Sequence, residues 1–113
     1  MKNVKVIIAL IFIVLAGVFA VQAGAEKKTI TFKVYGNCGM CKKNIETALE
    51  IKGIKSAVWN VDTKMIEVTY LPQQINEEQI HQAIAKAGYD TELVKAKDED
   101  YQKLHTCCQY RKE

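Results

Sequence analysis

Two of the four cysteines, Cys38 and Cys41, lie three positions apart where the predicted backbone changes from strand to helix. Gly36 and Gly39 lie on either side of Cys38 and favour a tight turn there. A thiol at the start of a helix is close to free backbone N–H groups and to the positive end of the helix dipole, which both favour the thiolate. A thiolate binds soft metal ions, and it also attacks disulfides. The spacing therefore predicts either metal capture or thiol–disulfide exchange.

The residues on both sides of this pair predict the elements that hold it. Residues 29–35 alternate between polar and apolar side chains, which predicts a half-buried strand. Its inward face carries Ile30, Phe32 and Val34. From Cys41 to Lys52 the apolar period becomes helical, and Gly53 is expected to end that helix.

A β-hairpin is expected in the middle of the chain. Residues 54–61 and 65–70 each alternate, and a short polar turn separates them. Trp59 takes an inward position and is expected in the core rather than at a binding site. The wetter face of the sheet is expected to carry Thr31, Lys33, Glu67 and Thr69.

A second helix is predicted after the hairpin. Asn76 and Gln79 have the spacing of a capping box, and Gly88 is expected to end the helix. Its buried stripe comprises Ile80, Ala83, Ile84 and Ala87. His81 lies off this stripe and is expected at the surface. Residues 89–94 are expected to form a short last strand.

The predicted order of elements is β-α-β-β-α-β, which indicates an α+β fold, a ferredoxin-like sandwich. Two helices would cover one face of a four-stranded antiparallel sheet. The chain divides into a signal peptide at residues 1–25, one domain at residues 26–95 and a cysteine-containing C-terminal tail at residues 96–113. No regular element is predicted in the tail, which is long enough to fold back over the first cysteine pair.

The signal peptide is predicted from three features of residues 1–25. Met1 to Lys5 is short and basic, residues 6–21 are apolar and uncharged, and Ala23 or Ala25 offers a cleavage site. The alternative is an uncleaved membrane anchor, for which the run is short against the ~20 residues of a spanning helix. We therefore expect a periplasmic or otherwise exported protein, with cysteines that are either paired or kept reduced by a partner.

The charge of the chain gives no case for an anionic partner. The full sequence has 16 basic and 13 acidic side chains, and loss of Lys2 and Lys5 with the signal peptide leaves 14 against 13, a net charge of +1. Neither nucleic acid nor an anionic membrane surface is expected to bind such a chain through its charge. Contact with a membrane is expected only through an uncleaved signal peptide.

The tail contains a second pair of thiols, the adjacent Cys107 and Cys108. They are candidates for accessory metal ligands, for a resolving pair or for a dimer contact, because adjacent cysteines bridge each other only with strain. Accessory ligation would raise the coordination number towards the four that Zn(II) prefers. His105 and Met40 are further candidates, although a solvated histidine and a packed methionine fit these positions equally well.

The chain resembles the heavy-metal-associated domain family, which includes periplasmic mercury-binding proteins, copper chaperones and metal-binding modules of copper pumps. The resemblance covers roughly residues 28 to 94 and rests on four segments in the right order. They are Gly36-Asn37-Cys38-Gly39-Met40-Cys41, residues 53–57, residues 67–70 and residues 85–90. The chain departs from the family at Gly36, where a methionine usually packs under the loop, and in its cysteine-containing tail.

The resemblance implies that Cys38 and Cys41 hold one soft ion, most often Cu(I) or Hg(II), and that Tyr89 lies beside it. Soft thiolates select soft ions, which agrees with this expectation. We expect an exported metallochaperone or scavenger for Cu(I), with Hg(II) and Zn(II) as alternatives, and not an enzyme. A metal transporter or a cuproprotein would exchange the ion with it, and a metal-bridged dimer is another arrangement.

Two other hypotheses remain open. The first is a thiol–disulfide oxidoreductase that uses Cys38 and Cys41, although the loop between them lacks the proline of thioredoxin-type loops. The second is a structural module stapled by zinc, which would unfold when the metal is chelated. A disulfide between Cys38 and Cys41 would close a very small loop and is a poor structural staple.

Overall fold

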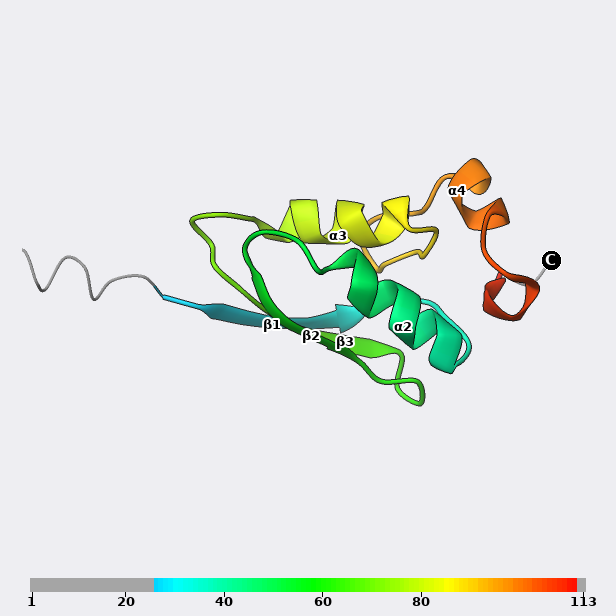
Figure 1. The fold of residues 1–113 in the computed structure, drawn as a ribbon, viewed down its shortest axis with the longest axis horizontal. Coiled ribbons are helices and arrows are strands. Elements are labelled where there is room, and N and C mark those ends of the chain that lie inside the picture. The colour runs from blue at the N-terminus through cyan, green and yellow to red at the C-terminus, as the bar shows by residue number, and fades with distance from the viewer. Residues whose placement is uncertain (1–25, 112–113) are drawn as a thin grey trace, which may run out of the picture.

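The computed structural model describes residues 26–111 of the chain (Figure 1). Its elements are β1 (Lys28–Lys33), α2 (Gly39–Ala48), β2 (Ile54–Trp59), β3 (Met65–Tyr70), α3 (Glu77–Lys86), α4 (Asp98–Gln102) and the 3₁₀ turn η1 (Thr106–Cys108). The predicted signal peptide, residues 1–25, lies outside the described residues. Within residues 26–111, no helix is both long enough and apolar enough to cross a membrane.

The three strands form one antiparallel sheet with the order β1-β3-β2. Phe32 of β1 and Trp59 of β2 lie on either side of Ile66 in the central strand β3. All three side chains are buried, as the alternating pattern predicts, and they form the middle of the core. Both α2 and α3 lie on the same face of this sheet (Figure 1). The fold is therefore α+β, with the two helices on one side as expected.

The expected fourth strand at residues 89–94 does not form. Among the described residues this segment makes only an isolated antiparallel bridge, between Thr91 and Val34. The Thr91 hydroxyl accepts the N–H groups of Leu93 (3.2 Å) and Val94 (3.0 Å), and the Thr91 N–H donates to the Val94 carbonyl (2.8 Å). These local bonds fold the segment into a turn, so it cannot continue along β1.

The helix that carries the cysteine pair is shorter than predicted. It ends at Ala48 rather than Lys52, because the N–H groups of Leu49 and Glu50 bond to carbonyls three residues back and tighten the last turn. Gly53 therefore lies beyond the helix, in the turn that leads into β2, where its φ of 96° suits glycine. Glu46 ties α2 to β2 by accepting the backbone N–H of Trp59 at 2.9 Å.

The second helix begins and ends as the sequence predicts. The Asn76 side chain accepts the Gln79 N–H at 2.8 Å, and the Gln79 side chain accepts the Asn76 N–H at 2.9 Å, which completes the capping box. The helix ends at Lys86, and Gly88 follows it with a left-handed φ of 105°.

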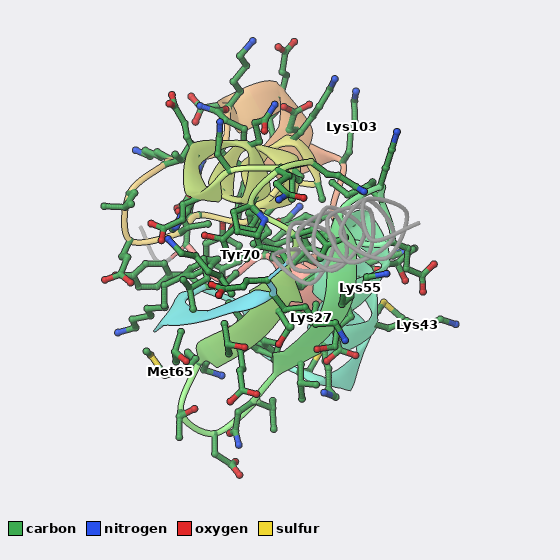
Figure 2. All side chains as sticks on the ribbon, turned by 90° about the vertical axis from the view of Figure 1, so that its left-hand side faces the viewer. Lys27, Lys43, Lys55, Met65, Tyr70 and Lys103 are labelled. Atoms are coloured by element: carbon green, nitrogen blue, oxygen red, sulfur yellow. The ribbon has the colours of Figure 1, made fainter. Side chains whose placement is uncertain are left out.

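Charged side chains such as Lys43 and Lys103 project into solvent (Figure 2).

The surface position expected for His81 is wrong. Its side chain is only 2% exposed and stacks on the Phe32 ring, with 3.9 Å between the ring centroids. Its Nδ1 atom lies 2.6 Å from the Thr91 hydroxyl, so a buried polar partner satisfies the imidazole. Burial lowers the pKa of His81, although Glu92 and Glu77 oppose this effect.

Candidate metal site

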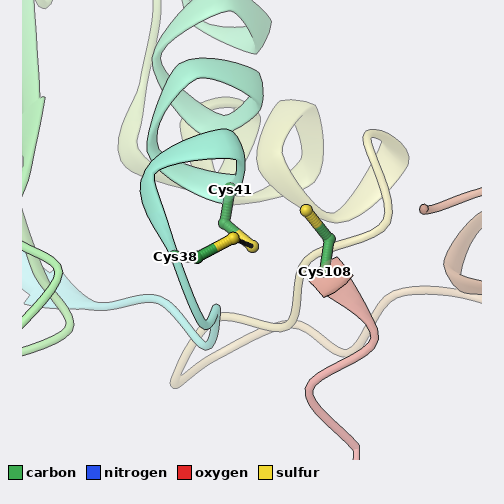
Figure 3. A group of neighbouring side chains, drawn as sticks. All are labelled: Cys38, Cys41 and Cys108. Carbon is green, nitrogen blue, oxygen red and sulfur yellow. Dashed lines mark hydrogen bonds between the residues drawn. The ribbon is translucent and has the colours of Figure 1, made fainter. Parts of the chain in front are cut away.

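Three cysteine sulfurs, two from the start of α2 and one from η1 in the tail, converge at the N-terminus of α2 (Figure 3). The Sγ atoms of Cys38, Cys41 and Cys108 all lie within 4.8 Å of one another. Those of Cys38 and Cys41 are 3.9 Å apart. Cys41 and Cys108 are fully buried, whereas Cys38 is partly exposed. The group can therefore bind a soft cation and remain in reach of solvent through Cys38.

The start of α2 provides the electrostatic setting of the first pair. Cys38 is the N-cap residue of the helix, and the backbone N–H groups of Cys41 and Met40 lower the pKa of its thiol to about 7. The Asn37 N–H donates to the Cys41 sulfur at 3.3 Å. The N–H groups of Cys41 and Met40 stabilise negative charge on the Cys38 sulfur, so the thiolate that the sequence predicts at this loop is accessible at Cys38 near neutral pH.

Trp59 packs directly beneath the cysteine loop. A Cβ atom at Gly36 would lie 3.1 Å from the Trp59 ring and 3.2 Å from the Cys41 Cβ. The indole therefore leaves little room for a side chain at Gly36, the position at which the family usually has a methionine. Its Nε1–H donates to the Val34 carbonyl at 3.0 Å, which fixes the ring. The sequence indicates a core position for Trp59, but it does not reveal that this residue supports the site.

Tyr89 lies in the core on the inner side of the cysteine group. Its hydroxyl accepts a hydrogen bond from the Asn44 side chain at 3.0 Å. Burial raises the pKa of Tyr89, against the effect of that hydrogen bond, and the neighbouring Cys108 raises it further. The phenol therefore stays neutral. The structure places Tyr89 near Cys41 and Cys108. It also shows that Asn44 holds the Tyr89 hydroxyl, a contact that the sequence does not predict.

Of the four accessory ligands suggested by the sequence, only Cys108 faces the first pair. The exposed Cys107 points instead to Met40, with 3.7 Å between the two sulfur atoms, and lies 3.9 Å from the Cys108 sulfur. Met40 is 45% exposed, and His105 is also exposed and lies outside the converging group. Burial raises the pKa of the Cys108 thiol to about 12, with Cys41 adding to the effect.

Tyr110 and Arg111, which follow the two tail cysteines, dock the tail on the domain. The Tyr110 hydroxyl accepts the Asp90 N–H at 2.7 Å and donates to the Gly88 carbonyl at 3.0 Å. The Arg111 guanidinium donates to both carboxylate oxygens of Asp90, at 2.8 and 3.2 Å, and to the Ala96 carbonyl at 2.7 Å. The tail therefore folds back over the site, as its length allows.

Asp90 is a positioning residue that the sequence does not mark. Burial alone would raise the pKa of its carboxyl group, but the hydrogen bonds of Arg111 and Ala96 and the charge of Arg111 lower it below its ordinary value. An aspartate and an arginine 21 positions apart give no local signal of pairing. The two side chains meet because the residues between them bring the tail back past Gly88.

Comparison with known proteins identifies the family of this fold and site. The model of the heavy-metal-associated domain family matches residues 20–90, so the chain belongs to that family. The CopZ metallochaperone has a similar structure, with a TM-score of 0.55 and 33% sequence identity over 57% of this chain and 98% of CopZ. The expected relation to copper chaperones is therefore confirmed.

Two curated relatives are metal-transporting ATPases. A cation-transporting ATPase of Oryza sativa subsp. japonica is 31% identical over 85 residues, which is 72% of this chain and 8% of that protein. A zinc-transporting ATPase of Synechocystis is 42% identical over 64 residues, which is 55% of this chain and 9% of that protein. The chain thus spans less than a tenth of the length of these relatives.

Proposed function

We propose that the protein binds one soft metal ion through Cys38 and Cys41 and acts as a metallochaperone or scavenger. The observation that carries this proposal is the pair of sulfurs 3.9 Å apart at a helix N-terminus, one buried and one partly exposed. Backbone N–H groups stabilise the Cys38 thiolate, and because Cys38 is partly exposed, it gives an incoming or departing ion a route. We infer a binding protein rather than an enzyme.

Cu(I) is the ion that the donor set favours. Thiolates are soft ligands, and Cu(I) accepts low coordination numbers, whereas Zn(II) in structural sites takes four ligands. The similarity to the CopZ metallochaperone supports copper, and the similarity to a zinc-transporting ATPase keeps Zn(II) as an alternative. Hg(II) is a further alternative because it is also a soft ion that thiolates bind. In each case the ion is the cargo of the protein, held by the cysteine sulfurs.

The proposed partner is a metal transporter or a cuproprotein with thiols of its own. A partner thiolate would bond to the ion at the side of Cys38, and a bond between the ion and a cysteine of this chain would then break. A periplasmic or otherwise exported location is proposed from the apolar segment at residues 6–21 and the small residues that follow it. A dimer bridged by the ion is a second arrangement with the same ligands.

A thiol–disulfide oxidoreductase is the rival function, and the lowered pKa of Cys38 favours it. In that reaction the Cys38 thiolate attacks a substrate disulfide, which forms a mixed disulfide and releases one substrate thiolate. Cys41 then loses its proton and attacks the Cys38 sulfur. The products are a Cys38–Cys41 disulfide and the reduced substrate.

An anaerobic Cu(I) competition titration on the reduced protein tests the proposal. We expect one tight equivalent that is weakened strongly in Cys38→Ser and in Cys41→Ser and that disappears when both cysteines are replaced. Cys107→Ser is the matched control, because its exposed sulfur does not converge on the pair. If the protein fails to compete with a moderate chelator, copper binding is refuted; catalytic turnover of a disulfide substrate by such a protein would establish the rival.

A further inference from the structure

We propose that Cys108 is a third thiolate ligand, supplied by the docked tail, so that a soft ion is bound by three sulfurs. This inference rests on the proposed function and specifies its site. It separates the two adjacent tail cysteines: Cys108 bonds to the ion in the interior, whereas Cys107 remains outside the coordination shell. The class of ligand is a soft cation that accepts trigonal thiolate coordination, such as Cu(I) or Hg(II).

The spacing of the sulfur atoms favours three ligands over two. With metal–sulfur bonds of about 2.3 Å, two sulfurs on opposite sides of an ion lie roughly 4.6 Å apart, and three in a trigonal plane lie roughly 4.0 Å apart. The Cys38 and Cys41 sulfurs are 3.9 Å apart, and the Cys108 sulfur lies within 4.8 Å of both. The distance between the Cys38 and Cys41 sulfurs is thus closer to the trigonal value than to the linear one, and the Cys108 sulfur is near enough to be the third ligand.

The surroundings of Cys108 differ from those of an ordinary buried cysteine. A free cysteine often packs as a small apolar side chain. The Cys108 side chain is fully buried, but its sulfur turns towards two other thiols rather than only towards aliphatic groups (Figure 3). Of the residues that the structure describes, these three cysteines are the ones whose ligand atoms meet in this way. Convergence from positions 38, 41 and 108 requires the tail to be docked.

The docking contacts hold Cys108 in place on both sides of η1. Before it, Leu104 packs against Gly88, where a Cβ would lie 3.0 Å from the Leu104 side chain. After it, Tyr110 and Arg111 bond to the segment at Asp90. The third sulfur is therefore positioned by contacts that do not involve the ion, which reduces the ordering that binding requires. On binding, the Cys108 thiol releases its proton to solvent as the sulfur–metal bond forms.

X-ray absorption of the Cu(I)-loaded protein tests this assignment. We expect three sulfur neighbours per copper in the native protein and in Cys107→Ser, and two in Cys108→Ser, with a loss of affinity of about tenfold or more in the latter. Two sulfurs in the native protein, or three retained in Cys108→Ser, would overturn the assignment. If the native protein binds no Cu(I), the proposed function itself fails, which is a different result.

A second pair of variants separates docking of the tail from loss of a sulfur. Arg111→Ala keeps all four cysteines but removes the bonds to Asp90 and Ala96. It is expected to weaken Cu(I) binding by a smaller factor than Cys108→Ser. Lys103→Ala, at an exposed position of the same tail, is the matched control and is expected to bind like the native protein. Unchanged affinity in Arg111→Ala would contradict the role of the docked tail.

Discussion

Replacement of Gly36 with alanine is expected to destabilise the protein and to displace the cysteine loop. The new methyl group would lie 3.1 Å from two carbons of the Trp59 ring and 3.2 Å from the Cys41 Cβ. Both neighbours are almost fully buried, and the Trp59 indole is also held by its bond to the Val34 carbonyl. Neither can move away cheaply, so the loop or the ring must shift.

The cost of this overpacking is expected to be about 1–3 kcal/mol. For a domain of this size each kcal/mol lowers the unfolding midpoint by roughly 4–8 °C, so the variant should unfold roughly 4–24 °C below the native protein. The chain has a single tryptophan, Trp59, which lies at the altered contact. Thermal unfolding followed by its fluorescence measures the effect directly, and Cu(I) affinity is expected to fall because Cys41 is displaced.

Gly39→Ala is the matched control on the other side of Cys38. A Cβ at Gly39 would meet no heavy atom within 4 Å, and Gly39 is the first residue of α2. Alanine is a better helix former than glycine by about 1 kcal/mol, so this variant should be as stable as the native protein or slightly more stable. Equal losses in the two variants, or no loss in Gly36→Ala, would refute the packing argument.

Three further predictions concern single contacts. Trp59→Phe leaves the buried Val34 carbonyl without its indole donor and should lower the free energy of unfolding by about 1–3 kcal/mol in urea titrations. Burial lowers the pKa of His81 in the folded protein, so below the ordinary histidine pKa of about 6.5 the unfolded chain binds more protons than the folded one. The free energy of unfolding should therefore fall as the pH drops below that value, and His81→Asn should lose this dependence on pH. The pKa of Asp90 is also lowered, so its pairing with Arg111 contributes in full above the ordinary value of about 3.9 and is lost as the pH falls through the lower folded value. Hydrogen exchange of the tail should then show release in acid, and a tail equally protected at low pH would contradict this.

Local patterns in the sequence were sufficient to predict the hairpin and the start of α3. Alternating residues place one face of each strand in the core, and the capping box between Asn76 and Gln79 involves residues three positions apart. The position of Cys38 and Cys41 was predictable for the same reason, because the change from strand to helix occurs next to them. Such interactions depend on neighbours in the chain and leave a readable signal.

The Thr91 hydroxyl explains two differences between the predicted and the observed structure. It accepts backbone N–H groups from the two residues that follow Glu92, and this turn replaces the expected fourth strand. The same hydroxyl lies 2.6 Å from His81 and allows an imidazole to be buried beside Phe32. No local period reports either contact, because a side chain that forms a turn and also pairs across the core is identified only once the chain is folded.

The sequence by itself determined that a thiol pair lies at a helix start and that a second pair follows in the tail. It did not distinguish Cys107 from Cys108, because two adjacent cysteines have the same side chain and lie almost equally far along the chain from the domain. The tertiary structure made that distinction, through the turn of η1 and the bonds that Tyr110 and Arg111 make near Asp90. These bonds join segments about 20 residues apart, and the path of the backbone between them directs one sulfur inward and its neighbour to solvent.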